Sequence, residues 1–184
     1  DWSSDVCSSD LNSFTDPYAV EAIRLVFEYL EIAYLSPNDL NARMHMHNAS
    51  ALAGIAFTNA SLGLVHSMAH KIGGEFGITH GLANAIMLPY IIQYNSIYTN
   101  KYQKLEKALG IGNLITAIKD LNKRLNIPET LGQCGEVEIK EAAFMQVLDR
   151  MSHNAVDDPC TLTNPNQPTV QDVKTLYSSA YYGA

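Results

Sequence analysis

Three of the six histidines of this chain, His66, His70 and His80, lie within one short stretch. A neutral imidazole is a good ligand for divalent iron, zinc, copper or nickel. A bound ion needs at least three protein ligands, with one position left open if it is catalytic. The residue types alone leave two interpretations open: the histidines belong to a metal site, or each is buried, neutral and hydrogen-bonded within the core.

Two helices joined by a glycine-rich turn must position these imidazoles. A predicted helix over 62–72 places His66 and His70 on one face, one turn apart. The glycines within 73–77 are expected to break it, and the apolar run that follows predicts a second helix, with His80 in the turn or first turn leading into it. Two such helices can fold back, so imidazoles distant in sequence can meet at one point.

The residues around the histidines are more specific than the histidines themselves. The stretch HSMAHKIGGEFGITHGLANAIMLP closely resembles the signature of the iron-containing alcohol dehydrogenases, which reads roughly H-x-M-A-H-x-x-G and then H-G-x-x-N-A-x-x-L-P. The resemblance extends from about Asn12 to the C-terminus. Each position of the pattern is matched, by His66, Met68, Ala69, His70, Gly73, His80, Gly81, Asn84, Ala85, Leu88 and Pro89.

This resemblance implies a metal centre and a hydride transfer. In the family, the metal is held by an Asp and a His of an N-terminal D-x-x-x-H segment and by two signature histidines, which correspond to His66 and His80. His70 matches the third signature histidine, which the resemblance places beside substrate and nicotinamide as a relay for the alcohol proton. The implied cofactors are Fe²⁺, with Zn²⁺ as the alternative metal, and NAD or NADP. The implied substrate is a small alcohol or aldehyde.

Part of that machinery has no counterpart in the sequence. The D-x-x-x-H pair is not found, and in the family it lies just upstream of the segment that matches Asn12. We therefore expect residues 1–11, DWSSDVCSSDL, to be an unrelated or disordered leader, and residues 12–184 to be a helical metal-binding domain without the α/β dinucleotide-binding domain. On this expectation the chain is an inactive catalytic half-site. The face that would pack on the lost domain favours self-association or a homo-oligomer.

Helical periodicity dominates the rest of the chain, and no segment shows convincing strand alternation. The GIG at 110–112 is interpreted as a turn between helices, because no strand precedes it and a third glycine is missing. We predict an all-α, bundle-like domain of about seven or eight helices. Besides those around the histidines, helices are predicted over about 17–30, 40–60, 98–109, 113–125, 138–153 and 169–182.

Composition limits the classes of function. The net charge of -7 argues against a nucleic-acid partner. No apolar run reaches the roughly 18 residues of a membrane span, so no membrane partner is predicted. The three cysteines, Cys7, Cys134 and Cys160, are odd in number and lack metal-site spacing. Because no signal peptide is recognised either, we expect a reducing, cytoplasmic setting.

Three hypotheses make different structural predictions. A dehydrogenase domain brings His66 and His80 together, with His70 close by but not ligating. A small metal-binding module without catalysis uses His66 and His70 as an i, i+4 chelate. A helical interaction module holds all three histidines in protein contacts with no accessible cavity. The signature favours the first hypothesis.

Three further features leave function and packing open. The loop 156–168, which contains Cys160, either borders the substrate pocket or is a packed and capped loop. Lys71 either faces a dinucleotide or is solvated, as a lone lysine on a helix usually is. His45 and His47 lie two apart and cannot share a helical face, so neither is predicted as a ligand, although one is expected to pack near the site.

Overall fold

The computed structural model describes residues 14–183, which form α-helices, two short 3-10 helices and connecting segments, with no strand in that range. The all-α fold and the predicted seven or eight helices are confirmed. The predicted leader, residues 1–11, lies outside the described residues. The α-helices of this described range are eight in number: α2 (Asp16–Leu35), α3 (Leu40–Ala60), α4 (Leu64–Phe76), α5 (His80–Asn95), α6 (Lys101–Leu109), α7 (Leu114–Arg124), α8 (Glu141–Val156) and α9 (Val170–Tyr182). The 3-10 helices are η1 (Leu131–Gln133) and η2 (Pro159–Thr163).

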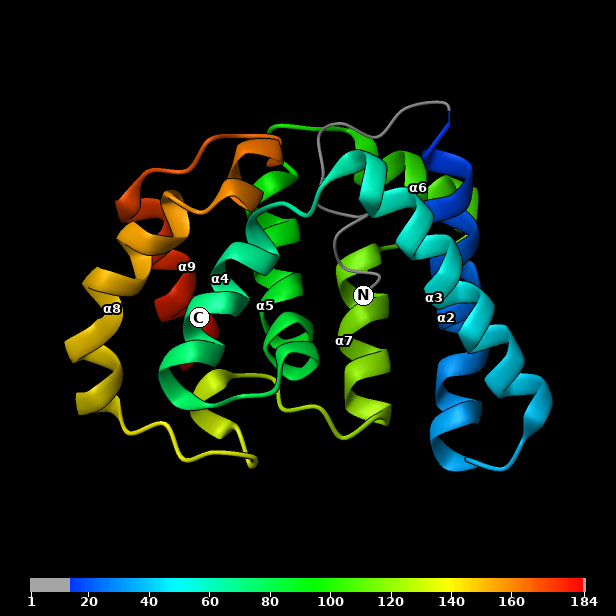
Figure 1. Ribbon diagram of the computed structural model, residues 1–184, viewed down its shortest axis with the longest axis horizontal. Helices are drawn as coiled ribbons and strands as arrows, with labels where there is room; N and C mark the ends of the chain where they lie inside the picture. Colours follow the sequence, from blue (N-terminus) through cyan, green and yellow to red (C-terminus); the bar gives the residue numbers. More distant parts are fainter. Residues whose placement is uncertain (1–13, 184) are drawn as a thin grey trace.

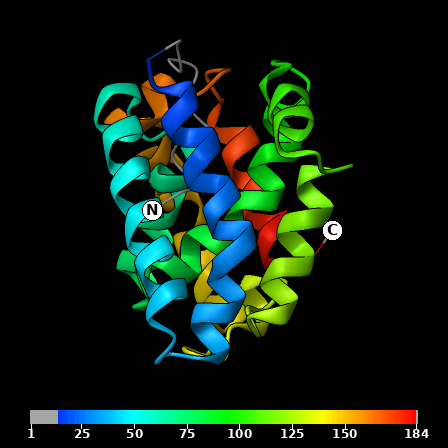
Figure 2. The same cartoon turned by 90° about the vertical axis from the view of Figure 1, so that its right-hand side faces the viewer.

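Helices α4 and α5 occupy the middle of the domain (Figure 1). Helices α8 and α9 flank them on one side, and α7, α2 and α3 lie on the other. After a quarter turn, α2 and α3 are seen side by side as an outer hairpin (Figure 2). The two helices that carry the histidine stretch are therefore covered from both sides.

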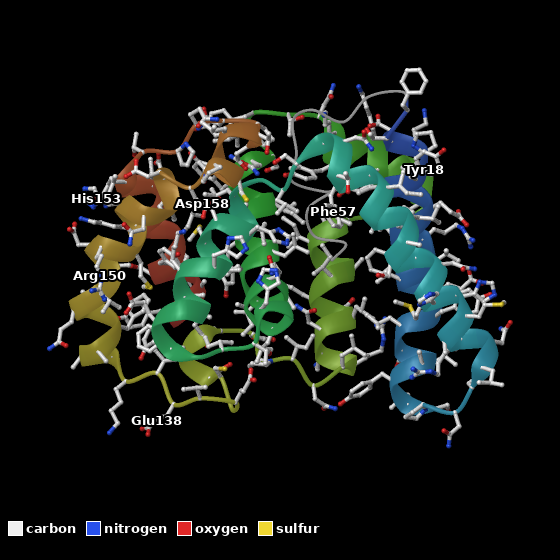
Figure 3. The ribbon with its side chains drawn as sticks, viewed as in Figure 1. Tyr18, Phe57, Glu138, Arg150, His153 and Asp158 are labelled. Atoms are coloured by element: carbon white, nitrogen blue, oxygen red, sulfur yellow. The ribbon has the colours of Figure 1, made fainter. Side chains whose placement is uncertain are left out.

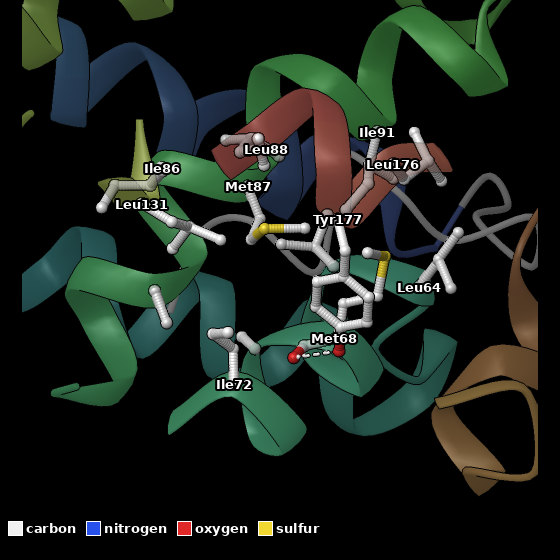
Figure 4. Packing of buried hydrophobic residues seen from close by; sticks show 14 of the residues in the cluster. Leu64, Met68, Ile72, Ile86, Met87, Leu88, Ile91, Leu131, Leu176 and Tyr177 are labelled. Atoms are coloured by element: carbon white, nitrogen blue, oxygen red, sulfur yellow. Dashed lines mark hydrogen bonds between the residues drawn. The ribbon is translucent and has the colours of Figure 1, made fainter. Parts of the chain in front are cut away.

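The main core is built around α4 and α5. Leu64, Met68 and Ile72 recur at helical spacing on α4, and all three are fully buried. Tyr177 of α9 is also fully buried, and its hydroxyl donates a hydrogen bond of 2.8 Å to the carbonyl oxygen of Met68 (Figure 4). Helix α9 thus fixes α4 midway between His66 and His70.

A proline inside α5 is compensated by a neighbouring helix. Pro89 has no N–H, so the carbonyl oxygen of Ala85, four residues earlier, loses its helical donor. The side-chain amide of Asn122 on α7 donates to that oxygen at 2.9 Å. The backbone of α5 is therefore satisfied where the proline interrupts it, and α7 is tied to it there.

The end of α4 differs from the sequence prediction. Gly73 and Gly74 do not break the helix, which continues to Phe76 and ends at Gly77 in the left-handed conformation, with φ 75°. A Cβ on Gly73 would lie 3.1 Å from the carbonyl oxygen of Ile78, so the returning chain packs closely on this glycine. Tertiary packing outweighs the weak helix propensity of glycine here.

The remaining local signals match the structure with small shifts in helix bounds. Gly110 ends α6 in the left-handed conformation and Asn113 caps α7 through the N–H of Thr116, so the GIG segment is a turn between helices as predicted. Thr169 and Asp172 form a capping box at the start of α9. Helices α6 and α8 start three residues later than predicted. For α8 the reason is that its N-cap residue, Lys140, makes no side-chain cap hydrogen bond that sequence could reveal.

Helices α3 and α4 meet at a bend of 105°. The connection passes through Ser61 and Gly63, whose φ angles are 64° and 83°. Such angles turn the chain sharply, and they send α4 away from α3 and into the core. Within the described range, no single helix is both long and apolar enough to cross a membrane; only this bent pair, taken together, passes on length and composition.

Candidate metal and catalytic centre

The three histidine rings of the signature meet where α4 faces the start of α5. Their ring centroids lie 5.1 Å apart for His66 and His80, 5.2 Å for His70 and His80, and 5.9 Å for His66 and His70. His80 is the first residue of α5, as predicted. The left-handed turn at Gly77 therefore brings a histidine of the second helix back onto those of the first.

Ring orientation distinguishes the pairs. The lone pair of an imidazole nitrogen lies in the plane of its ring, so two rings stacked in parallel planes do not point their lone pairs at one ion. His66 and His80 are tilted by 52°, whereas His70 stacks on His80 with planes only 18° apart. His66 and His70 are inclined by 70° but are the most separated pair. The geometry thus favours His66 and His80 as a ligand pair.

Burial divides the three rings and keeps them neutral. His66 is 2% exposed, and burial lowers its pKa to about 4. His70 and His80 are exposed, yet partial burial also lowers their pKa values. Neutral imidazoles are ready to bind a metal. Because two of the rings reach the surface, the arrangement does not match a set of histidines wholly enclosed in protein contacts.

Asn84 holds His80 in place from one turn further along α5. Its side-chain nitrogen donates to the carbonyl oxygen of His80 at 2.9 Å and lies 3.0 Å from the Nε2 atom of that ring. Asn84 matched the family pattern, and its spacing of four residues from His80 on one helix is the signal that could have revealed this contact.

The segment after α8 brings a carboxylate close to the ring of His70. Asp158 is hydrogen-bonded to the ammonium of Lys71 at 2.7 Å, and the same oxygen lies 3.6 Å from Nδ1 of His70. Figure 3 shows Asp158 beside α4. Burial opposes its ionisation, but the hydrogen bonds from Lys71 and from Cys160 outweigh burial and lower the pKa of Asp158 to about 2. Asp158 is therefore a carboxylate at neutral pH.

This contact corrects the interpretation of Lys71 as a solvated lysine. Its side chain is 27% exposed and forms an ion pair with Asp158, which lies 87 positions further along the chain. No local pattern joins the two residues, so sequence reasoning missed both the ion pair and Asp158 itself. A lone aspartate in a loop carries no spacing signal of its own.

The loop 156–168 is packed against α4 and α5. The hydroxyl of Thr161 donates to the carbonyl oxygen of Ala155 at 2.6 Å, and its oxygen lies 2.7 Å from the hydroxyl oxygen of Ser67. Asn164 exchanges two side-chain hydrogen bonds of 2.9 Å with Asn95. These contacts support the packing interpretation for Asn164 and hold the neighbouring η2 turn in position.

Cys160 lies in η2 as a half-buried free thiol. Burial and a hydrogen bond to the carboxylate of Asp158 raise its pKa to about 11, so it is protonated at neutral pH. Of the remaining histidines, His45 stacks on Tyr29 of α2 with centroids 4.0 Å apart. It therefore packs within the α2–α3 hairpin.

The description of the matching family model is "Fe-containing alcohol dehydrogenase family, C-terminal", and the match covers residues 5–181. This chain belongs to the iron-containing alcohol dehydrogenase family. It is 43% identical to the NADPH-dependent butanol dehydrogenase of Clostridium saccharobutylicum, in an alignment that covers 92% of this chain and 45% of that protein. It is 35% identical to the bifunctional aldehyde-alcohol dehydrogenase AdhE of Escherichia coli (strain K12), over 94% of this chain and 22% of that protein.

Solved structures of iron-type dehydrogenases share the fold. The iron-containing alcohol dehydrogenase of Thermococcus thioreducens matches with a TM-score of 0.89 and 32% identity, covering all of this chain and 48% of that one. A 1,3-propanediol oxidoreductase matches with a TM-score of 0.87 and 33% identity, over 98% of this chain and 49% of that one. The chain thus spans half or less of the length of these relatives.

The structure places the ring centroids of His66, His70 and His80 between 5.1 and 5.9 Å from one another. It adds Asn84 at His80 and Asp158 at His70, neither of which the sequence assigned to the site. The roles of the three histidines as ligands and proton relay stay predictions, and they are taken up as proposals below.

Proposed function

We propose that this chain supplies the metal-binding and proton-handling half of an iron-dependent, NAD(P)-linked dehydrogenase that interconverts small alcohols and aldehydes. One observation carries the proposal: the ring centroids of His66 and His80 lie 5.1 Å apart, and the rings are inclined. These residues occupy the two signature positions that bind metal in the family. The names of the relatives, a butanol dehydrogenase, an aldehyde-alcohol dehydrogenase and a 1,3-propanediol oxidoreductase, support the substrate class.

The donor chemistry fits ferrous iron. Imidazole nitrogen is a ligand for Fe²⁺ and for Zn²⁺, which is the alternative metal. His66 and His80 would hold the ion, and the low pKa of His66 keeps its ring available to about pH 4. A bound ion supplies Lewis acidity toward the oxygen of the alcohol. Because two imidazoles are fewer than the three ligands that an ion needs, we expect weak binding by this chain alone.

His70 is proposed to move the alcohol proton. Its ring stacks on His80, so it neighbours the ligand pair without joining it, and its side chain is 40% exposed. The carboxylate of Asp158 lies on the Nδ1 side and favours the tautomer with hydrogen on Nδ1. The other ring nitrogen is then free to accept a proton from a substrate hydroxyl, and solvent receives it afterwards.

The setting and the partners complete the proposal. NAD or NADP is assigned as the hydride acceptor, with the butanol dehydrogenase naming NADPH. A cytoplasmic location is supported by the free thiols of Cys134 and Cys160. Self-association or a homo-oligomer is supported by apolar side chains at one end of the α2–α3 hairpin, where Phe14 and Ile55 are 85% and 48% exposed.

The test is an anaerobic calorimetric titration with Fe²⁺ of the 184-residue chain and of single alanine variants at His66, His70 and His80. We expect weak binding that is lost in His66→Ala and His80→Ala and retained in His70→Ala. His45→Ala, in the hairpin, is the matched control and should bind as the parent chain does. Loss in His66→Ala and His70→Ala alone would establish the local i, i+4 chelate instead. Absence of binding in the parent chain would contradict the proposed half-site.

A further inference from the structure

One nitrogen, one oxygen and one sulfur donor lie close together where His70 of α4 meets the start of η2. Within the described part of the chain, a ligand atom from each of His70, Asp158 and Cys160 lies within 4.8 Å of the other two. His70 comes from α4, while Asp158 and Cys160 come from the start of η2. Two separate segments therefore converge on this cluster, and the family signature includes only one of its members.

The cluster is held in place and reaches solvent at one end. Asp158 is 9% exposed and accepts the N–H of Cys160 at 3.0 Å, which fixes the two residues relative to each other. His70 is 40% exposed, so the cluster opens to solvent at that end. An ionised carboxylate has about four lone-pair sites and accepts further partners beyond those it already has. Asp158 and Cys160 are thus held in a fixed relative position, and the cluster is open to solvent at His70.

We propose that His70, Asp158 and Cys160 form a second metal site, which takes a borderline-soft divalent cation such as Zn²⁺. Zinc is commonly bound by thiolate, imidazole and carboxylate together, whereas Mg²⁺ and Ca²⁺ prefer oxygen ligands alone. On binding, the S–H bond of Cys160 breaks, its proton goes to solvent, and the sulfur forms a bond to the metal. Three protein donors leave the fourth tetrahedral position to water.

Lys71 competes with the metal in this design. Its ammonium lies 2.7 Å from the Asp158 oxygen that also faces His70, so the ion must share or take over that oxygen. Removing the ammonium while keeping a polar side chain, as in Lys71→Gln, should therefore tighten metal binding by roughly twofold to fivefold, the factor that corresponds to the loss of one competing ion pair.

The site also has a consequence for catalysis. An ion held by His70 would occupy the ring that is proposed to relay the alcohol proton, so filling the site would inhibit the dehydrogenase. This consequence rests on the proposed function, whereas the metal site itself rests only on the three donors and their distances.

The test uses Cd²⁺ as the probe, because cadmium bound to thiolate gives an ultraviolet charge-transfer band. The full chain carries Cys7→Ser and Cys134→Ser, so Cys160 is the single thiol. We expect the band to saturate at one Cd²⁺ per chain and to disappear in Cys160→Ser. Affinity should fall at least roughly tenfold in His70→Ala and in Asp158→Asn, as expected for the loss of one of three ligands. It should be unchanged in His66→Ala and His80→Ala.

Three results would overturn the proposal. They are no band at all, a band whose affinity is indifferent to both His70→Ala and Asp158→Asn, and loss of binding in His66→Ala or His80→Ala. The second would show capture by the thiol alone, and the third would place the ion at the histidine pair. Circular dichroism of each variant verifies folding. Cys160→Ser changes a single atom, so loss of the band in this variant tests the site even if Asp158→Asn fails to fold. Since Cys160→Ser should leave the Fe²⁺ titration unchanged, the two proposals fail independently.

Discussion

Two neighbouring helix pairs of this domain, α2–α3 and α4–α5, differ greatly in what they bury. Each buried residue of α3 is an alanine, and these alanines let α2 approach closely while removing little apolar surface from water. The α4–α5 pair instead buries large side chains such as Leu64, Met68 and Ile91, together with every residue over 64–69. One pair is a thin outer layer, and the other is the centre of the core.

The proposed functional groups lie on the heavily buried pair. His66 sits within the buried run of α4, and His80 begins α5, so their backbones are fixed by packing from α8, α9 and α7. The outer hairpin carries exposed apolar residues instead, such as Leu40, which is 80% exposed. The comparison teaches that the most tightly packed elements place the site, while the loosely packed elements are left to face solvent or a partner.

The largest expected effect separates two methionines. Met68→Ala on α4 removes a fully buried side chain, and we expect it to lower the free energy of unfolding by about 2–5 kcal/mol. Met44→Ala on α3, where the side chain is 52% exposed, should change it by no more than about 0.5 kcal/mol. Urea unfolding of both variants measures the difference. Equal losses would show that the hairpin is packed as firmly as the centre.

The next effect is the pH dependence that the buried ring of His66 creates. Its pKa is about 4 in the folded chain, against an ordinary value of 6.5, because burial disfavours the charged form. Between these values the unfolded chain binds a proton that the folded chain does not. The contribution of His66 to the free energy of unfolding is therefore fully present above pH 6.5. It is lost as the pH drops toward 4, which lowers the free energy of unfolding by on the order of 3 kcal/mol.

Urea unfolding of the parent chain and of His66→Gln at several pH values tests this. The glutamine variant has no imidazole at this position, so its stability should decline less over the same pH range. A variant with the same pH dependence as the parent chain would refute the assignment to His66.

The smallest effects come from three glycines and sharpen the comparison within the helices. Alanine at Gly54 of α3 or Gly74 of α4 meets no atom within 4 Å, so each change should stabilise the chain by about 0.5–1 kcal/mol. Alanine at Gly73 would crowd the carbonyl oxygen of Ile78 at 3.1 Å, and we expect it to be destabilising. Thermal unfolding of the three variants gives the order. A stabilising Gly73→Ala would mean that the returning chain yields easily.

Local signals allowed much of the fold and the histidine cluster to be predicted. Asn113 and the Thr169–Asp172 pair indicate helix N-termini, because such residues form capping hydrogen bonds within one turn. The structure contains both caps. The meeting of His66 and His80 was also predictable, because one chain reversal separates them and the signature surrounds both. Signals of this kind need no knowledge of the rest of the molecule.

Other features could not be predicted because their causes lie far away in the sequence. Pro89 is tolerated inside α5 because Asn122 of α7 supplies the missing donor. Asp158 joins the site only through the packing of the segment that follows α8. In each case a contact with a residue distant in the sequence determines the conformation or the role of the residue. The spacing of residues along the chain does not indicate such a contact.

The reversal at Gly77 also has a consequence for the order in which the domain folds. His66 and His80 are brought together by contacts between adjacent helices, which close early because the intervening chain is short. Lys71 and Asp158 are 87 positions apart, so we expect them to meet only after α8 has docked. We therefore expect the contact between His66 and His80 to be formed already in the transition state for folding. The contact of Asp158 with Lys71 should form only after the transition state.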